Sequence, residues 1–274
     1  MDFESHVIAG FKNKFIGDDG AVLGQWVASK DLFCENTHFK RGWLSPKAIA
    51  YKSMIVNISD AIAMNARPKY VLLGLGLDRA DVELVDGLRA GFKQACDEFG
   101  CEIVGGDTIK SSELNISISV LSRLENGAKA LRRTGLKAGD LIAHTGELGS
   151  SLAGLKALLN GGKARSKSRF VRPVLRGDFI YKAARFLRCG MDISDGLSRD
   201  LGRLCAINRL GFKFKKAKSK QELSSGEEYE MLVAFSPRHL HKIARLAQKS
   251  RTKLSVFGIA KRGKYRHWGK GEHF

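Results

Sequence analysis

The sequence predicts a two-domain protein of the α/β (α+β) class. Its 274 residues, 43% of them hydrophobic, are enough to form a sizeable core. Runs with strand periodicity alternate with runs of helical periodicity, most regularly in the second half. Charge also divides the chain, since residues 1–124 carry 14 Lys and Arg against 16 Asp and Glu, and the rest carry 33 against 12. We therefore expect domains at 1–125 and 126–274.

The longest element expected in the first domain is a helix at 46–66. Ser45 and Pro46 suit its N-cap and first turn, and Arg67-Pro68 suits its end. The other elements expected here are a buried strand, an amphipathic helix ended by Gly100, a short strand and an alternating strand, at 71–77, 84–99, 101–104 and 114–124.

The second domain is expected to alternate strands and helices. The expected strands lie at 141–144, 191–194, 229–235 and 253–260, and the expected helices at 150–160, 179–189, 195–207 and 237–249. The segment Gly149-Ser150-Ser151 precedes one of these helices, so its backbone amides could bind an anion, or the segment could be a simple N-cap.

Several acids stand singly at turn signals or on apolar helices. Asp60 shares a face with Asn57 on the expected helix, where a surface acid or a buried cap for a loop would also explain it. The others beside apolar runs are Asp18, Asp19, Asp31, Asp107, Asp192 and Asp195. Carboxylates gathered at strand ends are what a hard cation such as Mg²⁺ requires. The two glycines before Asp107 would admit a phosphate to the backbone, although a tight hairpin turn is the plainer interpretation.

Composition excludes several classes of site. The five cysteines are odd in number and form no Cys-x-x-Cys pair, which argues against a zinc site and a disulfide framework. The N-terminus has no pattern of a cleavable leader, and no apolar run approaches the length of a membrane span. We therefore expect a soluble, cytoplasmic protein with reduced cysteines and no membrane partner.

Two basic runs lie in the second half, at 165–176 and 213–220. Three interpretations would each explain these runs: a solvated face, a positive field that attracts phosphorylated ligands, or a nucleic-acid surface. Aromatic interleaving is limited to Phe212 and Phe214, and no nucleic-acid signature accompanies the charge. A nucleic-acid partner is therefore not expected.

The acid motifs together resemble a known family. The segments that carry the resemblance are Gly17-Asp18-Asp19, Asp31 with His38-Phe39, Asn57-Ile58-Ser59-Asp60-Ala61-Ile62-Ala63-Met64, Gly105-Gly106-Asp107, Arg132-Arg133-Thr134-Gly135, Asp192-Ile193-Ser194-Asp195-Gly196-Leu197, Gly226-Glu227-Glu228-Tyr229-Glu230 and Gly271-Glu272-His273-Phe274. They are similar to thiamine-monophosphate kinase, in the same order along nearly the whole chain. Relatives of that family include aminoimidazole ribonucleotide synthetase, selenophosphate synthetase and a hydrogenase maturation factor. The early His-Phe and the Gly-Glu-Glu-Tyr-Glu segment favour the thiamine enzyme.

The resemblance implies a fold and a reaction. The N-terminal domain would be an antiparallel-sheet domain that binds ATP and Mg²⁺ and forms a barrel with a second subunit, and the C-terminal α/β domain would lie on the substrate side. The reaction would be direct in-line transfer of the terminal phosphoryl of ATP to thiamine monophosphate, with no residue as covalent nucleophile. The implied ligands are thiamine monophosphate, ATP and Mg²⁺, with a monovalent cation left open.

The resemblance also assigns residues. The metal ligands would be Asp18, Ser29, Lys30, Asp31, Asp60, Asp107, Asp192 and Asp195. The residues contacting ATP would be Arg89, Gly106, Asp107, Arg133 and Ser194. Thiamine would contact His38, Glu227 and an aromatic residue, Trp268 or preferably Phe274, because an aromatic face attracts a cationic ring.

Some positions depart from the family pattern. Glu228 stands where the family has Asp, Arg89 where a Tyr is expected, and the C-terminal motif is one residue shorter. Segments 160–175 and 208–226 are also shorter than in typical members. Two other functions therefore stay open: another ATP-using enzyme of the superfamily with a different acceptor, or a basic RNA-binding protein without catalysis.

Overall fold

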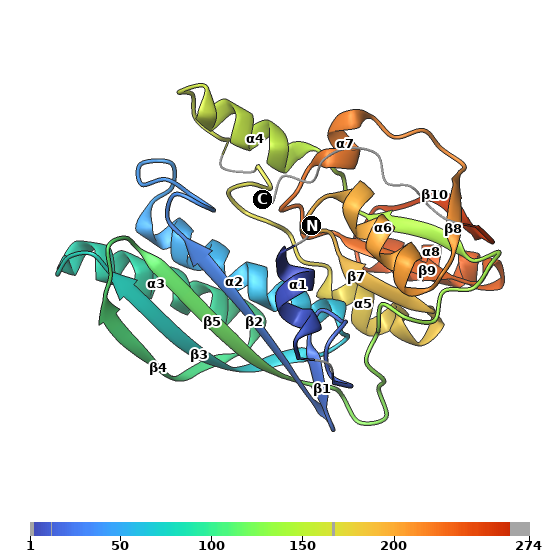
Figure 1. Ribbon diagram of the computed structural model, residues 1–274, viewed down its shortest axis with the longest axis horizontal. Coiled ribbons are helices and arrows are strands. Elements are labelled where there is room, and N and C mark those ends of the chain that lie inside the picture. The colour runs from blue at the N-terminus through green and yellow to red at the C-terminus, as the bar shows by residue number, and fades with distance from the viewer. Residues whose placement is uncertain (1–2, 12, 166–167, 264–274) are drawn as a thin grey trace.

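The computed structural model describes residues 3–11, 13–165 and 168–263, and contains two five-stranded sheets (Figure 1). The first has the order β1-β2-β5-β3-β4 and the second the order β7-β9-β6-β10-β8. The strands of the first sheet are β1 (Ala21–Leu23), β2 (Trp26–Cys34), β3 (Arg67–Leu77), β4 (Glu102–Lys110) and β5 (Asn115–Arg123). The strands of the second are β6 (Leu141–Thr145), β7 (Cys189–Asp192), β8 (Gly211–Phe214), β9 (Met231–Phe235) and β10 (Leu254–Lys261).

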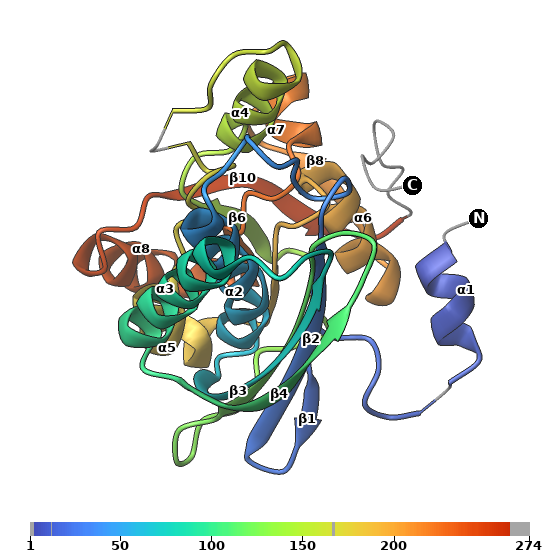
Figure 2. The ribbon, with the colours of Figure 1, turned by 90° about the vertical axis from the view of Figure 1, so that its left-hand side faces the viewer.

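Two long helices, α2 (Pro46–Ala63) and α3 (Val82–Phe99), cover one face of the first sheet (Figure 2). This sheet is antiparallel except for its edge pair, in which β4 runs parallel to β3. Both helices follow the sequence signals, since the Ser45 hydroxyl accepts a hydrogen bond from the Ala48 amide and Gly100 ends α3 in the left-handed conformation. The prediction for these helices is confirmed to within three residues at each end.

The second sheet is antiparallel throughout and has helices on both faces. Along β9, Met231 and Phe235 join the core shared with α2, whereas Leu232 and Ala234 join the core under α6 (Leu197–Ile207). The remaining helices are α1 (Phe3–Ala9), α4 (Ser150–Leu159), α5 (Gly177–Ala183), α7 (Lys220–Ser224) and α8 (Leu240–Lys249), with short 3₁₀ turns at Ala184–Phe186 and Pro237–His239.

Helix α2 joins the two sheets into one body. It packs on β2 and β5 of the first sheet and also on β7 and α5. One hydrophobic cluster therefore runs from Ile116 and Ile118 through Ile58 to Phe179 and Phe235. The strands of the first sheet end at Arg123 and those of the second begin at Leu141, which suits the expected boundary. Because the core is shared, the division at residue 125 stays a prediction.

The segment Gly105-Gly106-Asp107 lies inside a strand, so the expected hairpin turn is wrong. β4 continues to Lys110, beyond the expected end at 104, and pairs along its whole length with β3. A Cβ on Gly106 would lie 1.8 Å from the Leu73 carbonyl oxygen. The close approach of the two strands therefore explains this glycine without a phosphate.

Replacing Gly106 with Ala is expected to lower the free energy of unfolding by about 1–3 kcal/mol, because the strand would have to move away from β3. Gly105→Ala is the matched control, since its Cβ would meet only the Leu72 side chain at 3.4 Å. Urea unfolding followed by tryptophan fluorescence measures both variants. Equal stability of the two variants would show that Gly106 is not held by this packing.

Other differences from the expected elements have local causes. β3 begins at Arg67, so Arg67-Pro68 opens a strand as well as ending the helix. Strands β1, β2 and β8 and helices α1 and α7 were not predicted, because each is short or broken by polar residues. β8 places Phe212 in the core, leaves Lys213 exposed and packs the half-buried Phe214 against the same core. In the other basic run Arg172 pairs with Glu98.

All five cysteines are free in the structure. Among the described residues, no helix is both long enough and apolar enough to cross a bilayer.

Candidate active site

A cavity of about 950 Å³ lies between the two halves of the molecule. It is lined by the loop before β1, by β2, by α2, by the segment after β7 and by the start of the Gly226–Glu230 segment. Of the predicted site residues it gathers Asp18, Ser29, Lys30, Asp31, His38, Asp60, Arg133, Asp192, Ser194, Asp195 and Glu227. Gly106, Asp107 and Arg89 are not in its wall, and Trp268 and Phe274 lie outside the described residues.

Helix α2 brings Asp60 to the cavity. Val56, one turn earlier, also lines it, so one face of the helix is turned toward this space. Two contacts tie this face to its surroundings: the Ser29 hydroxyl donates to the Asn57 carbonyl at 3.4 Å, and the Ser59 hydroxyl donates to Asp192 Oδ2 at 2.6 Å. Helix α2 is thus fixed to β2 on one side and to the end of β7 on the other.

Three carboxylates meet at this point. Oxygens of Asp19, Asp60 and Asp192 all lie within 4.8 Å of one another. Burial raises the pKa of Asp192 to about 7, with the Asp19 charge adding to the effect. Burial, followed by the charges of Asp31 and Asp192, raises the pKa of Asp60 well above its ordinary value. Such a set of oxygen ligands, repelling one another in a partly dry site, fits a hard divalent cation such as Mg²⁺.

Asp19 is one of the acids noted in the sequence, but the resemblance assigned it no role. The resemblance assigned a metal role to Asp18, but Asp18 accepts hydrogen bonds from the Arg132 guanidinium at 2.6 Å and the Arg133 amide at 2.8 Å. The neighbouring Asp19 points into the carboxylate cluster and is also bound by the Arg133 guanidinium. Both acids lie in the bend at residues 17–20, before β1, so only the three-dimensional structure distinguishes their directions. The metal role of Asp18 stays a prediction.

Asp195 lies at the cavity wall among cations. Arg203 forms an ion pair with its carboxylate, and Arg199 lies 3.7 Å away. Its backbone amide donates to the buried Asp200 at 3.1 Å, which fixes the turn before α6. The metal role assigned to Asp195 therefore stays a prediction. The contact of Arg133 with ATP also stays a prediction, because the Arg133 guanidinium pairs with Asp19.

The Gly226–Glu230 segment gives its three glutamates three different positions. Glu227 lines the cavity, while Glu230 is buried and forms two hydrogen bonds, of 2.7 and 2.6 Å, with Arg176. Glu228 is also buried and accepts from the amides of Gly149 at 2.6 Å and Ser151 at 3.0 Å. The Glu228 carboxylate therefore occupies the amides that were expected to face an anion, and the N-cap residue Gly149 makes no side-chain cap.

A second cavity of about 440 Å³ adjoins the first, and His38, Asp195 and Glu227 line both. Its other walls are largely aromatic and aliphatic: Phe39, Trp43, Leu152, Leu155, Leu159 and Phe170. The Cys34 amide donates to His38 Nδ1 at 3.0 Å, so a neutral His38 carries its proton on Nε2. The pair of cavities thus offers a polar, acidic space beside a more apolar one.

Asp107 and Gly106 lie across the sheet from the acid cluster. One row of paired residues crosses the sheet from β2 to β4. Asp31 on β2 pairs with Ile118 on β5, and Ile118 pairs in turn with Leu73 on β3. Leu73 pairs with Gly106 on β4. Three strand spacings separate Gly106 from Asp31, about 14 Å. Asp107 therefore cannot share a metal ion with Asp31 of the same chain, and its assigned role stays a prediction that needs another arrangement.

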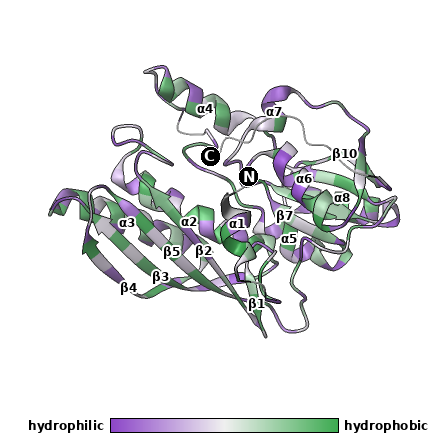
Figure 3. Ribbon diagram, viewed as in Figure 1, coloured by the Kyte–Doolittle hydropathy of each residue, from purple (hydrophilic) through white to green (hydrophobic). Residues whose placement is uncertain are grey.

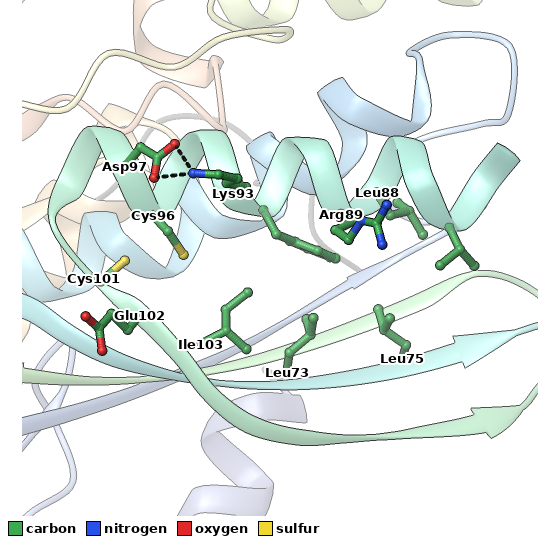
Figure 4. A pocket seen from close by; sticks show the side chains of 12 residues that line it. Leu73, Leu75, Leu88, Arg89, Lys93, Cys96, Asp97, Cys101, Glu102 and Ile103 are labelled. Carbon is green, nitrogen blue, oxygen red and sulfur yellow. Dashed lines mark hydrogen bonds and ion pairs between the residues drawn. The ribbon is translucent and has the colours of Figure 1, made fainter. Parts of the chain in front are cut away.

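Arg89 is also remote from the acid cluster. It lies on α3 at a groove of about 540 Å³ between this helix and strands β3 and β4 (Figure 4). Its guanidinium lies 3.1 Å from the exposed Asp86 carboxylate. Its assigned contact with ATP likewise stays a prediction.

Comparison with known proteins agrees with this geometry. Residues 17–123 match the family model described as AIR synthase related protein, N-terminal domain. The thiamine-monophosphate kinase of Aquifex aeolicus is 33% identical over 225 residues, which cover 78% of this chain and 72% of that protein. The enzyme of the same name from Buchnera aphidicola subsp. Schizaphis graminum is 30% identical over 274 residues, covering 89% and 84%.

The fold is shared as well. A solved structure of "AaThiL complexed with AMPPCP and TMP" superposes with a TM-score of 0.84 and 26% identity, covering 98% of this chain and 93% of that one. Identity of 30% or more over most of the length of curated relatives, together with this superposition, identifies the family. The chain belongs to the thiamine-monophosphate kinase family.

Proposed function

We propose that this chain transfers the terminal phosphoryl group of ATP to thiamine monophosphate, giving thiamine diphosphate and ADP. The observation that carries the proposal is the cluster of Asp19, Asp60 and Asp192 in the wall of the larger cavity. A relative with the same fold binds AMPPCP, an ATP analogue, together with TMP. The nucleotide and the phosphorylated acceptor would occupy the two adjoining cavities found here.

The reaction brings two polyanions together, so the catalyst must neutralise charge and align donor with acceptor. Asp19, Asp60 and Asp192 would hold Mg²⁺, with Asp31 nearby, and Mg²⁺ would supply the positive charge that offsets the phosphates. The acceptor phosphate is itself the nucleophile, so direct in-line transfer needs no covalent intermediate on the chain. Arg133, which lines this cavity, would contact the nucleotide phosphates.

The substrate side is assigned to the smaller cavity. Glu227 and His38 line both cavities and so stand at the border between them. If the phosphate of thiamine monophosphate reaches the acid cluster, its rings would lie in the smaller cavity, among the aromatic side chains. A carboxylate at this border suits the positive charge of the thiazolium ring. Trp268 and Phe274 remain the predicted aromatic contacts from the C-terminal segment.

The first sheet supports a homodimer. Its outer face and edge expose large apolar side chains, among them Leu32, Leu72, Val104 and Ile109, and apolar residues run along β3 and β4 in Figure 3. An exposed apolar edge of this kind is normally covered. A second copy is the occupant that suits it, and we propose that it is the partner.

The dimer would also explain Asp107. β1 pairs with β2 only as far as Ala28, so the edge of β2 from Ser29 onward has no pairing strand in the described chain. The outer edge of β4, which carries Asp107, also pairs with no strand of the residues that the structure describes. Pairing the β4 edge of one copy with the β2 edge of the other would bring Asp107 beside Lys30 and Asp31 of the partner. The nucleotide site would then be built from both chains.

The proposal is tested by incubating the purified protein with ATP, Mg²⁺ and thiamine monophosphate and identifying the products by chromatography and mass. Substituting aminoimidazole ribonucleotide precursors or selenide for thiamine monophosphate tests the related acceptors. ADP formation that depends on one of those acceptors instead would replace the assigned substrate.

A further inference from the structure

Lys52 is a buried cation in the middle of α2, and no metal or nucleotide role accounts for it. Its side chain is 0% exposed, and its Nζ lies 2.9 Å from Glu227 Oε2. Removing an ammonium group from water is costly, and a well-packed apolar residue commonly stabilises such a position as well or better. Stability alone therefore does not explain a lysine here.

Aromatic rings complete the surroundings of the Lys52 ammonium. Nζ lies 3.8 Å from the centre of the Phe170 ring and 5.6 Å from that of Phe33, and both rings are almost fully buried. Cation–π attraction at these distances offsets part of the desolvation cost. Glu227, Phe170 and Phe33 come from three separate segments, so together they fix the ammonium group in one place.

The ion pair with Lys52 orients the side chain of Glu227. Its backbone φ is 53°, in the left-handed region that non-glycine residues rarely adopt, and Tyr229 has a φ of 52°. The Glu227 amide donates to the Ser194 carbonyl at 2.7 Å, which holds its backbone but leaves its side chain to be oriented. The carboxylate lines both cavities, at the border assigned to the substrate.

We propose that Lys52 is a positioning residue that holds the Glu227 carboxylate at this border for the recognition of thiamine monophosphate. The inference rests on the proposed function for the identity of the substrate. The ion pair sets the direction of the Glu227 side chain before substrate arrives, so less conformational freedom is lost on binding. Lys52 also stands two turns before Asp60 on α2, so one helix aligns the recognition carboxylate with the acid cluster.

Steady-state kinetics of Lys52→Met test this role. The KM for thiamine monophosphate is expected to rise about tenfold or more, while the KM for ATP and the rise in Tm produced by Mg²⁺ stay close to wild type. Lys52→Arg, which keeps the cation, is expected to recover much of the affinity. Lys47→Met is the matched control, because it removes an exposed lysine from the same helix.

A double-mutant cycle with Glu227→Gln separates positioning from packing. Once the carboxylate is gone there is nothing left to position, so Lys52→Met with Glu227→Gln is expected to have the same KM for thiamine monophosphate as Glu227→Gln alone, within about twofold. The Tm of the double variant is expected to exceed that of Lys52→Met, because no unpaired carboxylate is left at the site.

A wild-type KM for thiamine monophosphate in Lys52→Met would overturn the positioning role, and so would KM increases that multiply in the double variant. Equal losses of affinity for ATP and thiamine monophosphate would point to a general structural role and would also overturn it. If the wild-type protein forms no thiamine diphosphate, the proposed function fails instead, and the substrate named here fails with it. The two failures are distinguished by the wild-type reaction alone.

Discussion

Replacing Asp60 with Asn is expected to reduce phosphoryl transfer roughly a thousandfold or more while raising the Tm measured without metal. The carboxylate faces Asp31, Asp192 and Asp19, and its pKa in the folded protein lies well above its ordinary value. A carboxyl group with a raised pKa destabilises the folded state at neutral pH, because folding then disfavours the charged form. Asn removes this charge and keeps the shape of the side chain.

Thermal unfolding in EDTA and in Mg²⁺ measures the effect. The wild-type protein is expected to gain Tm on addition of Mg²⁺, because the cation binds only the folded cluster, and Asp60→Asn to lose most of that gain. Asp178→Asn is the control, since it removes an exposed carboxylate outside both cavities. A lower Tm of Asp60→Asn in EDTA, with the Mg²⁺ effect retained, would contradict the metal cluster.

A mixture of two inactive variants, Asp60→Asn and Asp107→Asn, is expected to regain activity when their subunits exchange. In a mixed dimer, one cavity would keep its own Asp60 and receive Asp107 from the partner, so one site in two would be complete. Random exchange should therefore restore about a quarter of wild-type activity. If both residues served the cavity of their own chain, each cavity of the mixed dimer would lack one of them.

The control for this experiment is a mixture of Asp60→Asn with Asp192→Asn. Both residues belong to one cluster in one chain, so exchange leaves every site of the mixed dimer incomplete. One variant of each mixture is labelled with heavy nitrogen, because the unlabelled variants have equal mass, and native mass spectrometry then verifies that subunits have exchanged. Absence of recovery in an exchanged Asp60→Asn and Asp107→Asn mixture would contradict the proposed sharing of the site.

Much of the fold could be predicted from local sequence signals. Helix α2 starts at a Ser-Pro pair, helix α3 ends at Gly100, and buried and half-exposed residues alternate along β5. Each of these elements therefore has a signal in its own sequence. The Gly105-Gly106 pair was interpreted as a turn, because glycine is common both in turns and where two backbones approach closely. The pairing of β4 with β3 shows that close approach is the reason here. Asp107 and Asp31 are far apart because of the strand order and register of the sheet. The sequence of neither strand alone predicts that order or register.

The candidate site was predicted in large part by resemblance, and its assigned roles are still predictions. The structure brings eleven of the predicted residues to one cavity. It also shows what a linear motif cannot, namely that Asp19 and not Asp18 points to Asp60 and Asp192. Lys52 was not predicted as functional because a single lysine in an apolar helix resembles a surface residue, and only its contact with Glu227, 175 residues later, sets it apart.

The measurement that tests the central claim most directly is product analysis after incubating the purified protein with ATP, Mg²⁺ and thiamine monophosphate. We expect thiamine diphosphate and ADP in equal amounts, with almost none from Asp60→Asn. ATP binding without thiamine diphosphate formation would contradict the assigned acceptor. Failure to bind ATP at all, with RNA binding that weakens steeply with salt and survives Asp60→Asn, would contradict the account as a whole.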